Sequence, residues 1–248
     1  NPLYVSGIIE FMVGDLSMKT WTAWSNDDES KKKLIVDAET TLLSLGNNIS
    51  SVMERNGELE HTEHKPKDVV NVLLAFVPTD DLPRCSTDTK FRLSAIKVAN
   101  DKLNSWRKSI ISMTHYIYET NQLVHTHSDE SIFDCLLNTQ QAMLLDECIS
   151  DKNTAQQLVF SAVNKLTGYG IKMFERLKAY EQSDNSDNVQ LNKEKLVGMF
   201  LDGLSVKEMD TMLRDNDYLT TKIAEGNAAL EAHAKQQREG NQGDMPQS

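Results

Sequence analysis

Two histidines and a cysteine near the middle of the chain are residue types that can bind a metal ion. His125 and His127 precede a segment with a helical apolar pattern, and Cys135 lies on that segment. Neutral imidazoles and thiolates are good zinc ligands, so this group would suit a metal-dependent enzyme. On a strand or a helix, however, the two imidazoles point in nearly opposite directions, and no Cys-x-x-Cys pair accompanies them. We favour the alternative that Cys135 and Cys148 are buried and pack as small apolar residues.

A second pair of histidines, His61 and His64, lies one helical turn apart in a segment rich in glutamate. With a carboxylate, these imidazoles would also suit zinc. The stronger zinc motif, His-Glu-x-x-His, has a wider spacing and an adjacent general base, and the sequence does not contain it. We therefore interpret residues 58–67 as a solvated, charged loop.

Other common catalytic motifs are missing from the sequence. It contains no Gly-x-Ser-x-Gly turn and no phosphate-binding loop, and Cys85 has no histidine near it along the chain. We expect no catalytic residue, no metal and no cofactor, and hence a protein that is not an enzyme. The basic residues between Lys90 and Lys108, Arg92 among them, suit either an acidic partner helix or phosphate, or else an ordinary surface, which we favour.

The strongest pattern in the chain is a line of apolar residues at alternating steps of three and four. It predicts a helix from Lys90 to Val124, roughly 50 Å long at about 1.5 Å per residue, with a heptad seam. Such a stripe cannot remain exposed to water, so it must form a core or an interface, within one chain or between chains. The residues expected to carry it are Ile96, Leu103, Trp106, Ile110, Met113 and Ile117.

The N-terminal part of the chain is expected to contribute two helices. Residues 3–24 predict an apolar helix in which Trp21 and Trp24 share one face. They form either core, which we favour, or an apolar patch for a partner or a membrane interface. A second helix is predicted from Asp28 to Arg55, because it begins with acidic residues and stops at Asn56-Gly57.

Residues 69–77 are ambiguous. Pro66 suits the first turn of a short helix, whereas the apolar run that follows it also suits a buried strand, and we favour the helix. Pro78 and Pro83 are then expected to bracket a rigid linker through Ser86.

Two more helices are expected in the middle of the chain, from Ser131 to Ile149 and from Asp151 to Gln182. The second contains Gly168 and Gly170, and each glycine weakens a helix by about 1 kcal/mol relative to alanine. We therefore predict a bend or a break at these glycines.

Together these patterns predict an all-α protein, an elongated helical bundle with long antiparallel helices that pair like a coiled coil. Ser205 and Glu208 have the spacing of a capping box and are expected to open a single C-terminal helix. The expected organisation is an N-terminal helical hairpin in 1–57, a loop with a short helix and a proline-bracketed linker in 58–89, a long-helix bundle in 90–182, C-terminal helices in 183–238 and a disordered tail in 239–248.

Composition narrows the classes of partner. The chain has 248 residues and a formal charge of −11, which disfavours nucleic acid, because binding phosphates requires lysine and arginine. Charged residues interrupt the apolar N-terminal segment, so no membrane span is expected.

Three cysteines are too few for a disulfide framework, and no secretory signal is visible. We expect a cytoplasmic protein with reduced thiols, or one exported without a cleaved signal peptide.

The order of the expected elements also resembles a known family. This order resembles that of the extracellular filament and needle-tip proteins of type III secretion systems. It consists of an apolar helix, a charged helix, the segment Pro66-Lys-Asp-Val-Val70, and a long heptad helix that opens with Leu93-Ser-Ala-Ile-Lys-Val-Ala99. The resemblance covers about the first half of the chain. It implies terminal helices that pair as a coiled coil, subunits that polymerise or cap a needle, and a helical chaperone that covers the seam before export.

Helix pairing, with partner proteins or between copies of the chain, is therefore the expected activity. The leading hypothesis is a non-enzymatic assembly protein, in its specific form a virulence-associated secretion filament or tip component. The alternative is an intracellular helical adaptor or a nucleocapsid-like scaffold. A metal-dependent enzyme that uses His125, His127 and Cys135 is a third hypothesis.

Overall fold

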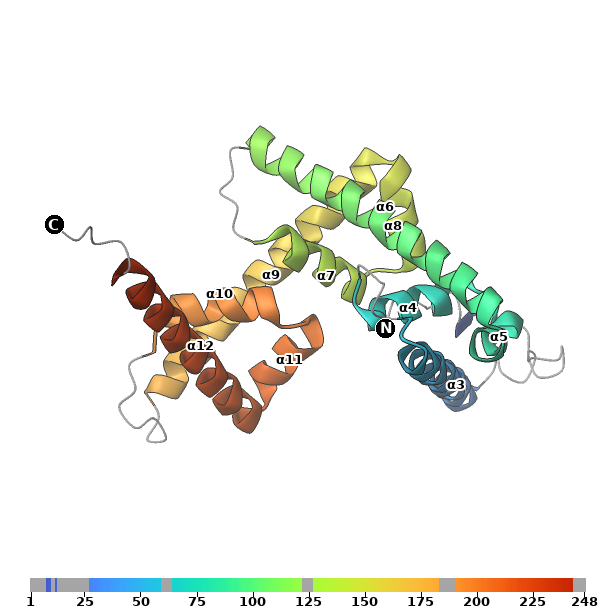
Figure 1. Cartoon of the computed structure of the whole chain (residues 1–248), viewed down its shortest axis with the longest axis horizontal. Coiled ribbons are helices and arrows are strands. Elements are labelled where there is room, and N and C mark those ends of the chain that lie inside the picture. Colours follow the sequence, from blue (N-terminus) through green and yellow to red (C-terminus); the bar gives the residue numbers. More distant parts are fainter. Residues whose placement is uncertain are drawn as a thin grey trace. The chain divides into compact units, whose positions relative to one another are not determined.

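The computed structural model describes residues 8, 9, 12, 27–58, 64–121, 127–182 and 191–242. In this part of the chain the regular elements are helices and no strand occurs, which confirms the predicted all-α class (Figure 1). The elements are α3 (Asp28–Arg55), α4 (Pro66–Phe76), the short 3-10 helix η2 (Thr79–Asp81), α5 (Leu82–Thr87), α6 (Thr89–Asn121), α7 (Asp129–Thr139), α8 (Ala142–Ser150), α9 (Lys152–Glu181), α10 (Lys193–Gly203), α11 (Val206–Arg214) and α12 (Asn216–Gln242).

The described residues divide into two compact units. Unit 1 holds α3 to α6 and the residues Leu136–Val159, and unit 2 holds residues 127–135 and the chain from Phe160 onward. The five segments expected from the sequence do not map onto these units. Each unit is assembled from stretches that are separate in the sequence. The spacing of apolar residues along the chain does not reveal which separate stretches pack together.

Helix α3 has the predicted bounds. Asp27 caps it, since its carboxylate accepts a hydrogen bond from the backbone N–H of Glu29 at 3.1 Å. Asn56 ends the helix, and Gly57 follows with φ of 67°, a left-handed conformation that glycine adopts without strain.

Residues 66–76 form helix α4, so the helical interpretation of the ambiguous run is correct. Pro66 occupies the first turn, where the N–H that proline lacks would have no partner within the helix. Five apolar side chains of α4 are buried, which makes it the central helix of unit 1: Val69, Val70, Val72, Leu73 and Leu74. It packs against both α3 and α6.

The predicted proline-bracketed linker is wrong. The chain from Thr79 to Thr87 forms η2 and α5, because Pro83 lies in the first turn of α5 and does not interrupt it. Leu82 and Cys85 lie three positions apart, share one face of the helix and are fully buried. This face packs α5 against α3 and α6, so the segment belongs to the core.

The helix predicted from Ser131 to Ile149 is in fact two helices, α7 and α8, which separate at Gln140 and Gln141. Leu136 and Leu145 are both fully buried, yet nine positions correspond to about two and a half turns and would place them on opposite sides of one straight helix. The break, with Gln141 in an extended conformation, allows both to be buried.

Helix α9 runs without interruption through Gly168 and Gly170, so of the predicted bend or break the break does not occur. The missing side chain at Gly170 makes room for α10, since a methyl group there would lie 3.3 Å from Leu201 Cδ1. Asp151 caps the helix by accepting hydrogen bonds from the backbone of Asn153 and Thr154.

The capping box of Ser205 and Glu208 is confirmed at the start of α11. The single helix expected to follow is divided at Asp215, whose extended backbone ends α11 and whose carboxylate caps α12. Helix α12 continues to Gln242 and so includes the first residues of the predicted disordered tail. Within the described residues, no helix combines the length and the apolar character that a membrane span needs.

Candidate protein-interaction site

Helix α6 has one buried face, which contains all six of the predicted seam residues: Ile96, Leu103, Trp106, Ile110, Met113 and Ile117. The helices that pack most extensively against α6 in unit 1 are α4, α5 and α8. The sequence left open whether the seam closes within one chain or between chains. Here it is core of unit 1, so a partner that meets α6 has to use another face.

Trp106 is held by a polar network that joins three helices of unit 1. Its indole Nε1 donates a hydrogen bond to Asp146 Oδ1 at 2.8 Å, and Lys102 Nζ donates to both oxygens of the same carboxylate at 2.8 and 3.0 Å. The ammonium also lies 3.9 Å from the ring centroid of Phe76, a cation–π geometry. A buried indole N–H requires such a partner, so the network orients α4 and α8 on α6.

Beyond this network, a cleft of about 470 Å³ lies between the C-terminal half of α6, the end of α8 and the start of α9. Its lining mixes apolar and hydrogen-bonding side chains: Ser109, Ser112, Met113, Tyr116, Cys148, Ile149, Lys152, Asn153, Ala155 and Gln156. Met113, Cys148 and Ala155 are buried. Ser109 Oγ donates a hydrogen bond to the Cys148 carbonyl at 2.7 Å, which ties α6 to α8.

Two large apolar side chains line the cleft and remain exposed. Tyr116 is 55% exposed and Ile149 is 52% exposed, although side chains of this kind usually contribute to cores or interfaces. A partner that covered each of them would gain roughly half of the 1.5–3 kcal/mol of transfer free energy that accompanies burial of a fully exposed side chain of this kind. The phenol and the polar lining add directional hydrogen bonds, so the cleft suits an amphipathic protein segment.

Burial makes the cysteine of the cleft a weaker acid than a free thiol. Burial raises the pKa of the Cys148 thiol to about 11, with the nearby Glu147 carboxylate acting in the same direction. Nucleophilic attack requires the thiolate, which is scarce several pH units below that pKa. All three cysteines are buried and free, as the sequence predicted for Cys135 and Cys148 but not for Cys85.

Arg92 was expected on an ordinary surface, and this is wrong, because it is buried in an ion pair. Its Nε and Nη2 atoms donate to the two carboxylate oxygens of Glu58, each at 2.7 Å, and its Nη1 donates to the Cys85 carbonyl at 3.1 Å. The guanidinium holds the pKa of Glu58 below its ordinary value. Residues 58–67 were interpreted as a solvated loop, and this is wrong for Glu58, because its carboxylate is held in this ion pair. Nothing in the sequence pairs two residues 34 positions apart.

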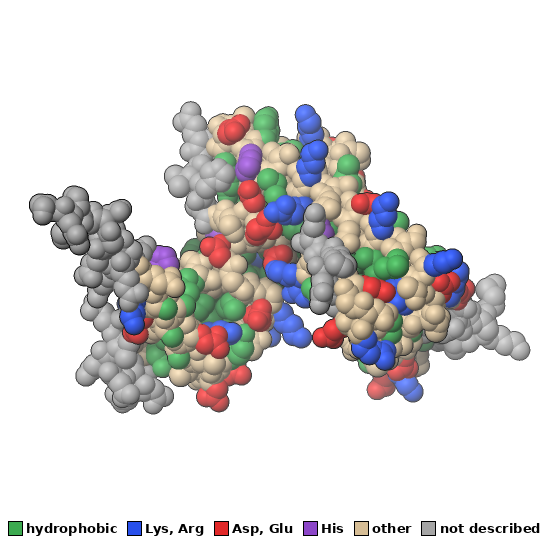
Figure 2. All heavy atoms as spheres, in the orientation of Figure 1, with side chains coloured by type: hydrophobic (Ala, Val, Ile, Leu, Met, Phe, Trp, Pro, Cys, Tyr) green, Lys and Arg blue, Asp and Glu red, His purple; other side chains and the backbone are tan. Residues whose placement is uncertain are grey.

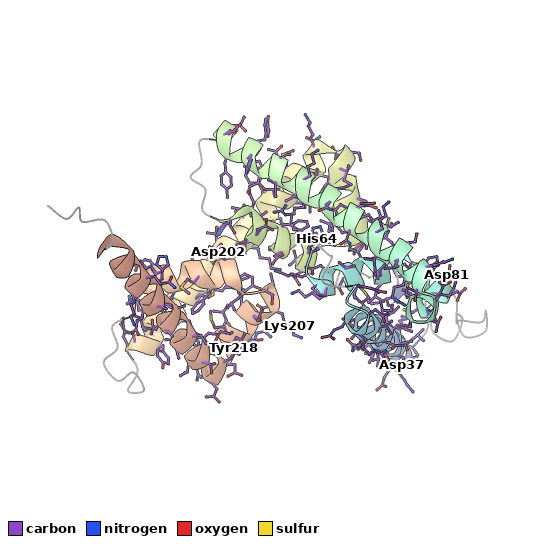
Figure 3. The ribbon with its side chains drawn as sticks, viewed as in Figure 1. Asp37, His64, Asp81, Asp202, Lys207 and Tyr218 are labelled. Atoms are coloured by element: carbon purple, nitrogen blue, oxygen red, sulfur yellow. The ribbon has the colours of Figure 1, made fainter. Side chains whose placement is uncertain are left out.

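Of the four histidines considered as metal ligands, the structure describes His64 and His127. His127 is buried and its Nε2 lies 3.0 Å from Thr167 Oγ1, a hydrogen-bond contact within unit 2. Ser128 and Ser131 donate to Asp202 Oδ1 at 3.0 and 2.9 Å, which fixes the start of α7 on α10 (Figure 3). Among the described residues, no three His, Cys, Asp or Glu side chains gather closely enough to hold a metal ion.

The remaining candidates are partly outside the described residues. His64 Nε2 lies 2.9 Å from Asn104 Oδ1, on α6 (Figure 3). His61, His125, Trp21 and Trp24 belong to the part of the chain that the structure does not describe.

A comparison of this chain with protein families, with curated proteins and with solved structures finds no match.

Proposed function

We propose that this protein is a non-catalytic helical interaction protein, and that a partner protein docks in the cleft between α6, α8 and α9. The observation that carries the proposal is the exposure of Tyr116 and Ile149 at a cleft whose deeper side chains are apolar and buried. Binding energy at protein interfaces concentrates in a few aromatic and aliphatic anchors of this kind, surrounded by polar residues.

The rigidity of the cleft supports the same proposal. The hydrogen bond from Ser109 to the Cys148 carbonyl and the network around Trp106 hold α6 and α8 in fixed register. A preformed surface loses little conformational entropy when a partner binds, and more of the contact energy appears as affinity.

The more specific roles stay predictions. A secretion filament or tip subunit, as the resemblance implies, would present a helical seam to its neighbours, and an intracellular adaptor or scaffold would do the same. In unit 1 the α6 seam is already covered. We therefore base the proposal on the exposed cleft and not on the seam.

A display experiment tests the proposal. A library of amphipathic helical peptides is enriched on the full chain, and the enriched peptides are measured by fluorescence anisotropy on the variants Tyr116→Asp and Ile149→Asp. The matched control is Ile171→Asp, which places the same charge on an exposed aliphatic residue (58% exposed) of α9 in unit 2.

We expect the two cleft variants to weaken binding by at least about tenfold, the equivalent of about 1.4 kcal/mol, and the control to bind like the parent. Circular dichroism melts confirm that each variant is folded. Failure to enrich any peptide, or peptides that bind the cleft variants as well as the parent, would overturn the proposal.

A further inference from the structure

A second apolar groove lies on α6, toward its N-terminal end. It has a volume of about 230 Å³ and lies between α4, the segment that leads to η2 and the first turns of α6. Phe76 and Val77 line it from α4 and its C-cap, and Phe91 and Val98 line it from α6. Val98 is 52% exposed although it is aliphatic.

The two hollows share one side of α6. Val98 lines the groove and Tyr116 lines the cleft, and their positions differ by 18, which is five whole turns at about 3.6 residues per turn. Both side chains therefore lie on one line along the helix, separated by about 27 Å at about 1.5 Å per residue. Ser105 and Ser112 are exposed and lie between them near the same line, and their small side chains leave room for a partner backbone.

A row of exposed lysines runs beside this line. Lys90, Lys97 and Lys108 are separated by about two and three helical turns, so they share a face of α6, offset from Val98 by about a quarter turn. Asp101 is the one carboxylate of the sequence between Lys90 and Lys108. Figure 2 shows basic side chains recurring along α6. This helix is thus locally basic in a chain whose formal charge is −11.

We propose that the partner of this protein is an acidic amphipathic helix that lies along α6. It places two apolar side chains about 27 Å apart, one in the cleft at Tyr116 and one in the groove at Val98, as the helical repeat requires. Carboxylates on one edge of the partner face the lysine row. This inference rests on the proposed docking cleft and adds the length, the charge and the second anchor of the partner.

The probes are three designed helical peptides of about 24 residues, long enough to span both hollows. They carry identical apolar anchors 18 positions apart and differ on one edge, which bears glutamate, glutamine or lysine. Affinity for the full chain is measured by fluorescence anisotropy at about 50 and 300 mM salt, because screening weakens exposed charge pairs. A single-stranded oligonucleotide of similar length tests phosphate as the alternative ligand.

Three variants separate the contributions. Val98→Asp removes the second anchor, and the triple variant Lys90→Gln, Lys97→Gln, Lys108→Gln removes the charge row. The matched control is another triple change of exposed lysines to glutamine, on α9: Lys165, Lys172 and Lys178.

We expect the glutamate peptide to bind at least about tenfold more tightly than the lysine peptide and to lose affinity in salt. Val98→Asp and the α6 triple variant should each weaken it by about tenfold, with the α9 control unchanged. Equal binding of all three peptides, insensitivity to both α6 changes, or tighter binding of the oligonucleotide would overturn the inference. If the peptides still depend on Tyr116, the docking cleft stands and only the acidic, two-anchor partner is lost. If they do not, both proposals fail.

Discussion

Trp106 is the largest fully buried side chain of the described residues, and its ring lies 6.0 Å from that of Phe76. We predict that Trp106→Ala lowers the free energy of unfolding by about 3–5 kcal/mol, since truncating a buried aromatic leaves a cavity. The change also removes a hydrogen bond to Asp146. Urea denaturation followed by circular dichroism measures the loss. Tyr116→Ala, an exposed aromatic on the same helix, should change it by less than about 0.5 kcal/mol.

The ion pair of Glu58 and Arg92 supports a second prediction. Arg92→Met leaves the Glu58 carboxylate buried without its cation and should cost about 3–5 kcal/mol of unfolding free energy. Lys97→Met, an exposed change on the same helix, serves as the control and should be nearly neutral. Adding Glu58→Gln to Arg92→Met should recover part of the loss in the same denaturation assay. A single variant as stable as the parent would show that the pair is not buried in solution.

At the scale of elements, substitution by alanine should change the stability of the protein in opposite directions at two glycines that lie within helices. Gly168 has open space where a Cβ would lie, so Gly168→Ala should stabilise the protein by up to about 1 kcal/mol through helix propensity. At Gly226 on α12, a Cβ would lie 2.6 Å from Leu196 Cδ2 on α10. Gly226→Ala should therefore destabilise by about 1–3 kcal/mol, because the buried leucine must move. Thermal melts of both variants test this, and shifts of the same sign would contradict the packing of α10 on α12.

Helix ends that carry a local cap signal were predicted correctly. Asp28, Arg55 and the Ser205 capping box are where the local pattern places them, because a cap depends on residues within one turn. The breaks at Gln141 and Asp215 were missed. Neither position carries proline or glycine, and the Gln141 break is needed only because Leu136 and Leu145 are both buried.

At the scale of the whole molecule, the two units should lose stability in different pH ranges. In unit 2, burial lowers the pKa of His127 below its ordinary value of 6.5, an effect that Asp202 partly offsets. The unfolded chain therefore takes up a proton more readily than the folded one as the pH falls below about 6.5. Unit 2 should lose stability from that pH downward, by at most about 1.4 kcal/mol per pH unit from this group.

In unit 1, Arg92 lowers the pKa of Glu58 from its ordinary value of 4.5. The ion pair therefore contributes its full stabilisation at any pH above 4.5 and loses it only at lower pH. Hydrogen exchange is measured at pH 7.5 and pH 5.5 and divided by the intrinsic rates at each pH, and the resulting protection factors should fall in unit 2 and stay nearly constant in unit 1. His127→Gln should reduce this difference between the units. An equal loss of protection in both units, or an unchanged pattern in the variant, would show that His127 does not govern the acid response.

The sequence by itself determined the helical class and the stripe of α6 that is buried. Apolar spacing and caps are local properties, and they act within a few residues wherever the helix is placed. Tertiary structure alone decided that the stripe is covered within unit 1, that Glu58 meets Arg92 and that Asp146 meets Trp106. These partners lie 34 and 40 positions apart. Their meeting depends on how whole helices pack, and no local periodicity encodes that.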